Sequence, residues 1–100
     1  MPKIYEYFGL VFLFYSNEHE PVHVHATSGG TQTIFDIYFE NGEVKEIRQR
    51  KKRGIDHLPP AKRKEAEKFV RAYAKKISQK WYETFVLNID LKCETITERI

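Results

Sequence analysis

Three of the four histidines lie in one short stretch and are the side chains best placed to do chemistry. They follow the spacing His-x-x-x-His-x-His, at His19, His23 and His25. Pro21 fixes its own φ and pushes the residue before it towards an extended conformation, so we expect a turn over residues 17–20 and then a strand. Residues two apart on a strand point to the same face. His23 and His25 are therefore predicted to stand side by side.

This cluster supports three interpretations. In the first, the imidazoles of His19, His23 and His25 bind Zn²⁺ or another divalent transition metal and leave one position for water, with Glu18 or Glu20 as a fourth ligand or a base. In the second, a histidine pair without metal acts as general acid and base on an RNA phosphodiester. In the third, the histidines only hydrogen-bond the turn and the strand or form a partner surface. The catalytic candidates are His19, His23, His25 and Glu18, and the same three histidines are the metal candidates.

Positive charge is concentrated in the second half of the chain. The net charge is only +3. The stretch from Arg48 to Arg53 is nevertheless strongly basic, and residues 62–80 add further lysines and arginines. Phosphate groups bind such side chains through charge. The alternatives are a solvated loop or a docking surface for an acidic partner. The nucleic-acid-binding candidates are Arg48, Arg50, Lys51, Lys52 and Arg53, and the tyrosines that either stack on bases or pack in the sheet are Tyr5, Tyr7, Tyr15 and Tyr38.

Length and composition predict one small domain over residues 1–100. The chain has 100 residues, 41% of them hydrophobic, which is typical of a globular protein. A single cysteine, Cys93, excludes an internal disulfide framework and suits a reducing compartment. No apolar run approaches the roughly 20 residues that span a membrane, and no signal peptide is recognisable. We expect a cytoplasmic protein.

Alternating and aromatic-rich segments predict strands over about residues 3–50. The apolar run from Leu10 to Tyr15 is hydrophobic on both faces, so it is predicted to be a central strand. Asn41-Gly42 is a strong hairpin signal. The expected strands are Ile4–Phe8, Leu10–Tyr15, Val22–Ala26, Thr33–Glu40 and Glu43–Arg50.

The last 40 residues predict a helix followed by a strand. Pro59-Pro60 suits a helix start, and apolar residues then recur with helical spacing to about residue 82. Beyond that, the period changes to two, which predicts a C-terminal strand over about 85–97 with Cys93 buried. The expected fold is α+β, an antiparallel sheet of five or six strands with one long helix packed on one face.

Several motifs together resemble a family of small bacterial proteins known as domain of unknown function 4160, or the DhiT-like proteins. They are Met1-Pro2 and Ile4, the run from Phe14 to His25, Leu58-Pro59-Pro60, and Trp81. The resemblance implies the toxin of a type II toxin–antitoxin pair, encoded beside a small partner, and it supplies no catalytic residues. The basic run and the strand after Trp81 depart from the family's usual pattern.

Two functions follow from these observations. The first is an intracellular toxin-like protein that acts on RNA or translation, as a ribonuclease-like enzyme or a metal-dependent hydrolase. The second is a non-enzymatic binding module, with or without a stabilising metal, whose basic stretch and last strand dock a partner protein; an antitoxin-like protein is one candidate partner. In either case the C-terminal strand is a candidate for pairing in a homodimer.

Overall fold

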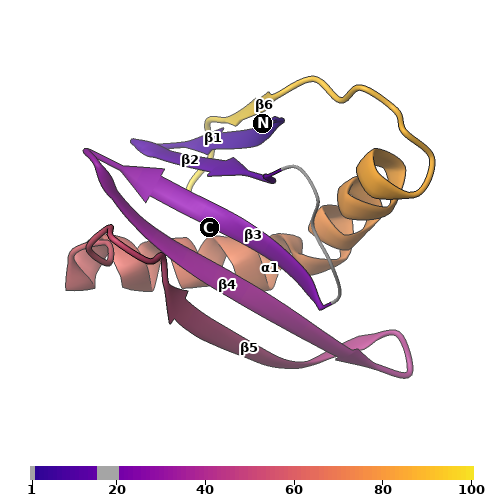
Figure 1. The fold of residues 1–100 in the computed structure, drawn as a ribbon, viewed down its shortest axis with the longest axis horizontal. Helices are drawn as coiled ribbons and strands as arrows, with labels where there is room; N and C mark the ends of the chain where they lie inside the picture. Colours follow the sequence, from indigo (N-terminus) through magenta and orange to yellow (C-terminus); the bar gives the residue numbers. More distant parts are fainter. Residues whose placement is uncertain (1, 16–20) are drawn as a thin grey trace.

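The computed structural model describes residues 2–15 and 21–100 and confirms the α+β fold. One six-stranded sheet has the order β5-β4-β3-β2-β1-β6, and the helix α1 (Pro60–Phe85) packs across one of its faces (Figure 1). The strands are β1 (Lys3–Tyr7), β2 (Leu10–Leu13), β3 (Val22–Ser28), β4 (Thr31–Glu40), β5 (Glu43–Lys51) and β6 (Glu94–Ile96).

Two-residue turns connect three of the antiparallel strand pairs. At Asn41 and Gly42, φ is 54° and 79°, the left-handed conformation that a tight hairpin turn requires at both positions. Residues 8–9 and 29–30 also have positive φ and join β1 to β2 and β3 to β4. These short turns fix the register, which in turn decides which side chains share a face.

The core lies between α1 and the sheet. Phe69 is fully buried on α1, and its ring centroid lies 4.5 Å from that of Phe12 and 5.3 Å from that of Tyr5. β2 lies inside the sheet, as its apolar sequence predicts, and Pro60 occupies the first turn of α1, as expected. The other buried residues of α1 follow the predicted helical stripe: Ala66, Val70, Ala74, Ile77 and Trp81.

The C-terminal region differs from the expectation. α1 continues to Phe85 because that ring packs on Trp81 one turn earlier, with centroids 5.3 Å apart, and on Phe14 at 5.7 Å. The strand expected over 85–97 shortens to β6, and Cys93 is exposed, not buried. β6 pairs with β1 in parallel, so the sheet is mixed.

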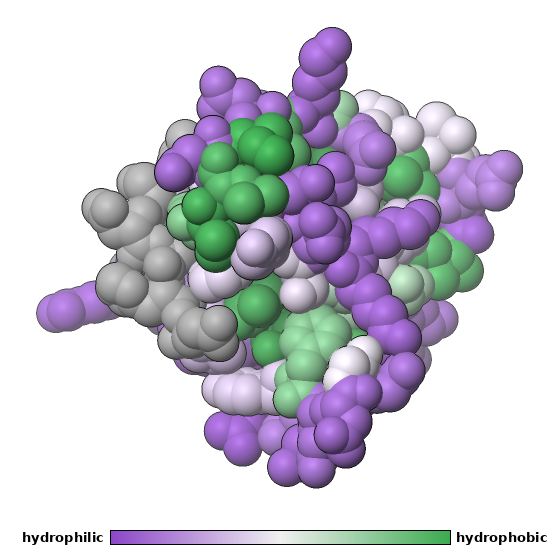
Figure 2. Space-filling view, turned by 90° about the vertical axis from the view of Figure 1, so that its right-hand side faces the viewer, coloured by the Kyte–Doolittle hydropathy of each residue, from purple (hydrophilic) through white to green (hydrophobic). Residues whose placement is uncertain are grey.

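Hydrophobic side chains remain exposed near the end of α1. Figure 2 looks onto that side of the molecule and shows hydrophobic groups gathered between hydrophilic ones. Because residues 86–93 run from α1 to β6 without pairing (Figure 1), their alternating pattern places apolar groups in solvent. The exposed large hydrophobics here are Tyr82, Val86, Leu87 and Ile89. Within residues 2–15 and 21–100, no helix combines the length and hydrophobicity that a membrane crossing requires.

Candidate functional site

His23 and His25 lie together on the sheet face opposite α1. Val24 and Ala26, which alternate with them on β3, are fully buried in the core under the helix. The two imidazole centroids are 5.7 Å apart, so the predicted side-by-side placement is confirmed. With exposed fractions of 9% for His23 and 3% for His25, both residues are nearly buried. This sheet face, with Tyr15, His23, His25, Asp36, Arg50 and Lys52, is called the histidine face below.

A backbone carbonyl orients the ring of His23. Its Nδ1 lies 2.8 Å from the carbonyl oxygen of Pro21, which can only accept a hydrogen bond. Nδ1 is therefore the protonated nitrogen, and the basic lone pair of the neutral ring is on Nε2. The turn at Pro21 thus sets the tautomer that a general base would need.

Tyr15 packs directly on His25. The two ring centroids are 4.0 Å apart. The Nζ atom of Lys52 lies over the Tyr15 ring, 4.6 Å from its centroid, in a cation–π contact. Gln32 of β4 fixes the phenol, since its Nε2 donates to the Tyr15 hydroxyl over 2.7 Å. The phenol ring of Tyr15 therefore contacts an imidazole, tilted against it by 39°, and also an ammonium group.

A bidentate ion pair borders the histidines. Asp36 is opposite His23 in the β3–β4 register and is 4% exposed. Arg50 of β5 donates from Nε to Oδ2 over 2.5 Å and from Nη2 to Oδ1 over 2.8 Å. A buried carboxylate requires such a partner, because an uncompensated charge in the interior is costly. The pair holds Arg50 against the histidine face.

The basic stretch splits between two faces. Arg48 lies over the ring of Tyr38 at 5.1 Å, and its contact with Glu46 raises the pKa of the guanidinium and lowers that of the carboxyl group. Arg48, Arg50 and Lys52 alternate along the chain and share the side of the histidines. The residues between them on β5 face α1, as the hydrogen bond of Gln49 to Glu67 of the helix indicates. Lys51, two residues after Gln49, faces the same way. Arg53 lies in the turn after β5.

The metal interpretation depends on residues that the structure does not describe. His19, Glu18 and Glu20 fall within 16–20, outside the described residues. Among residues 2–15 and 21–100, no three His, Cys, Asp or Glu side chains gather as a metal site would require. Metal binding through His19, His23 and His25 therefore stays a prediction. Where the ligands are present, Zn²⁺ would supply a polarised water.

Sequence reasoning found the histidines but missed two of their neighbours. Tyr15 was a candidate for base stacking and does lie beside His25, whereas Tyr5 and Tyr7 are core residues packed on Phe69. Gln32 and Asp36 were not predicted. The available signal was one carboxylate in the interior of an otherwise aromatic and branched strand, a position that needs a basic partner.

Comparison with protein-family models identifies one match. The family described as "Domain of unknown function (DUF4160)" matches residues 9–82, which include β2 to β5, the histidine face and most of α1. β1, β6 and the segment between α1 and β6 lie outside the matched residues. Searches of curated proteins and of solved structures found no match to the chain.

Proposed function

We propose that this chain, which belongs to the DUF4160 family, is a toxin-like protein that acts on RNA through the histidine face. One observation carries the proposal. The imidazoles of His23 and His25 stand beside a tyrosine and on the same side of the sheet as three cationic side chains of the basic stretch. Acid–base groups next to phosphate-binding groups are the combination that phosphodiester chemistry uses.

Each group has a distinct role in this proposal. His23 is the more exposed of the pair and carries its basic lone pair on Nε2, so it takes a proton from the hydroxyl that attacks the phosphorus. The bond from phosphorus to the leaving oxygen breaks, and that oxygen takes a proton from water. His25, which is almost fully buried, positions His23 and Tyr15. Arg48 and Lys52 contact phosphates through charge, while Arg50 remains paired with Asp36 and fixes the edge of the site.

RNA binding can be measured against salt. Replacing Arg48 or Lys52 with alanine should weaken binding of single-stranded RNA and reduce the dependence on salt by about one phosphate contact for each residue. Lys75→Ala is the matched control, because Lys75 is an exposed lysine on α1 that pairs with Glu43 across 3.0 Å. Equal losses in all three variants would indicate a general charge effect and contradict the proposed site.

Catalysis can be tested by RNA cleavage and by growth inhibition on expression. His23→Gln should reduce both by roughly 100-fold if His23 is a general base. His57→Gln is the control, since His57 bonds Thr33 on the helix side of the sheet, with Nδ1 and Oγ1 2.9 Å apart. If His23→Gln retained full activity in a folded protein, the catalytic proposal would be lost.

Metal analysis of untagged protein separates two versions of the proposal. About one zinc or other transition metal for each chain, lost in His23→Ala/His25→Ala, would support the hydrolase that uses metal. Protein that folds and cleaves RNA without bound metal would support acid–base chemistry by the histidines alone.

The alternative is a non-enzymatic module that docks an antitoxin-like protein, and the position of β5 favours it. β5 forms one edge of the described sheet, so the outer side of this nine-residue strand remains available for a strand from a partner. Binding through backbone hydrogen bonds should change little with salt, unlike RNA binding. β6 pairs within the chain, so a homodimer would have to use its outer edge; analytical ultracentrifugation tests this.

A further inference from the structure

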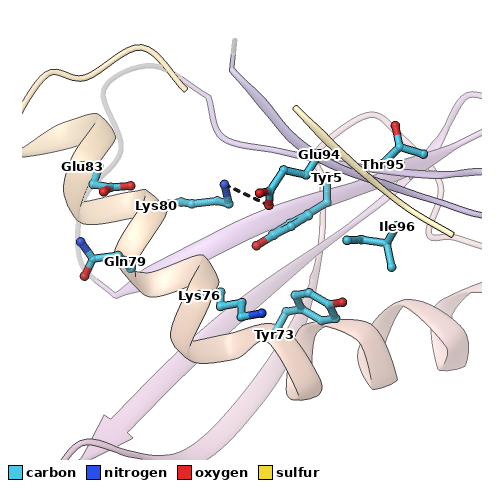
Figure 3. Close-up of a pocket in the computed structure, with 9 residues that line it drawn as sticks. All are labelled: Tyr5, Tyr73, Lys76, Gln79, Lys80, Glu83, Glu94, Thr95 and Ile96. Carbon is cyan, nitrogen blue, oxygen red and sulfur yellow. Dashed lines mark ion pairs between the residues drawn. The ribbon is translucent and has the colours of Figure 1, made fainter. Parts of the chain in front are cut away.

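A groove lies between α1 and β6, on the opposite side of the sheet from the histidine face. Its volume is about 650 Å³, within the size range of sites for small molecules. Figure 3 shows α1 as one wall and β6 as the other, with Tyr5 and Tyr73 between them. The wall from β6 lies outside the residues that the family match covers. This groove is independent of the proposed RNA site.

Two lysines of α1 supply the positive charge. Lys76 and Lys80 are four residues apart on the helix, so they are neighbours on one face. The side chain of Lys80 is only 15% exposed, and its Nζ lies 3.3 Å from Oε2 of Glu94 on β6. Lys76 has no ion pair among the described residues, and its Nζ lies 5.2 Å from the ring centroid of Tyr73. Of the two lysines, Lys76 is therefore the one more available to bind an anion.

The tyrosines and an isoleucine supply an apolar and aromatic surface. Tyr73 is half-buried, and its ring lies near Ile96 in Figure 3. Tyr5 is almost fully buried, and burial raises the pKa of its hydroxyl, with a further contribution from the charge of Glu94 and a hydrogen bond to it. Tyr5 thus remains a neutral donor that holds Glu94 beside Lys80.

Carboxylates limit where an anion can bind. Glu94 and Glu83 both lie near Lys80 (Figure 3), so that end of the groove carries balanced charge. The opposite end has Lys76, whose positive charge is paired with no carboxylate of the described residues and lies next to the ring of Tyr73. Charge and aromatic surface therefore meet at Lys76.

We propose that this groove binds a small aromatic phosphate of the nucleoside monophosphate class. The phosphate contacts the ammonium groups of Lys76 and Lys80, and the planar ring packs on Tyr73 and Ile96. Glu94 competes with the phosphate for Lys80. Removing the charge of Glu94 should therefore strengthen binding, and removing the charge of Lys76 should weaken it.

Titration of the full chain with adenosine 5′-monophosphate tests the site, with ¹H–¹⁵N NMR to locate binding and calorimetry to measure it. Lys76→Gln should weaken binding about tenfold, the loss expected for one hydrogen bond to a charged group. Glu94→Gln should strengthen it several-fold. The controls change the same charges elsewhere: Lys75→Gln on the outer surface of α1, and Glu40→Gln, whose partner is Lys45 on β5.

The outcomes separate specific binding from general attraction. Adenosine and inorganic phosphate, each alone, should bind more weakly than the monophosphate, because each uses only half of the groove. Shifts confined to the residues that line the groove, including Tyr73, Lys76, Lys80 and Ile96, would support the proposal. It would be overturned by shifts centred on β5, by equal effects of Glu40→Gln and Glu94→Gln, or by no response in the folded wild-type protein.

Discussion

The two faces of the sheet are built from different interactions. The face under α1 is an aromatic and aliphatic core in which Phe69 is surrounded by Tyr5, Tyr7, Phe12 and Tyr73. The histidine face instead buries a histidine pair and a carboxylate that is held by bidentate hydrogen bonds. Packing depends on shape and volume, whereas polar burial depends on particular partners.

We infer from this difference that the helix-covered face stabilises the fold and that the histidine face is the one suited to chemistry. The helix-covered face buries enough apolar surface to hold the fold, since aromatic side chains contribute large areas there. The histidine face contributes less to stability, because buried polar groups add little net stability even when satisfied. Its buried histidines and carboxylate make it the candidate for chemistry.

The largest effect is expected from the helix-covered face. Phe69→Ala should lower the free energy of unfolding by about 3–5 kcal/mol, because it removes the ring at the centre of the core and leaves a cavity. Denaturant unfolding followed by circular dichroism measures the change. Phe69→Leu, which keeps most of the volume, should cost clearly less. Similar losses in both variants would mean that the ring contacts, not the volume, dominate.

The next largest loss of stability is expected when the ion pair on the histidine face is broken. Arg50→Ala should cost about 2–3 kcal/mol, since it leaves the buried carboxylate of Asp36 without its bidentate partner. Arg48→Ala removes an exposed arginine and should cost clearly less, because solvent screens exposed ion pairs. If both variants were equally stable, the polar network would not be part of what holds this face together.

The hydrogen bond that fixes Tyr15 should have a moderate effect. Tyr15→Phe keeps the ring against His25 but removes the hydroxyl that accepts from Gln32, and we expect a loss of about 1 kcal/mol. Tyr82→Phe is the matched control, because Tyr82 is exposed on α1. A loss in the control as large as that in Tyr15→Phe would remove the argument for a specific polar contact.

Among these variants, Tyr5→Phe should change the free energy of unfolding least at neutral pH. Its effect should appear at alkaline pH. Burial, and then Glu94, raise the pKa of Tyr5 above its usual value. Tyrosine in an unfolded chain ionises near pH 10, so the unfolded state loses this proton first. The free energy of unfolding should therefore fall as the pH rises above about 10, and Tyr5→Phe should reduce that fall. Urea unfolding between pH 8 and 11 measures it; identical slopes would contradict the prediction.

Local signals predicted most of the fold. Asn41-Gly42 specified its hairpin because both residues accept positive φ, and the stripe from Ala66 to Trp81 specified the buried side of α1. The strand expected over 85–97 was mostly wrong. An alternating pattern shows only that a strand is possible, while Phe85 is held in the helix by rings distant in sequence.

The candidate site was predictable only in part. Side chains two residues apart on a strand share a face, which predicted that His23 and His25 lie together. The structure confirms this placement. The partners of that pair depend on the strand order, which brings β5 next to β4 and so Arg50 to Asp36. No local pattern contains that information. The roles of His19 and Glu18 remain predictions.

The parallel pairing of β1 with β6 joins strands that are far apart in the sequence, and it affects the order in which the sheet can form during synthesis. β2 to β5 pair with near neighbours, so their contacts can form while synthesis continues. β1 cannot gain its second neighbour until residues 94–96 have left the ribosome. The nascent chain therefore carries an unpaired strand edge at β1 until β6 has been synthesised.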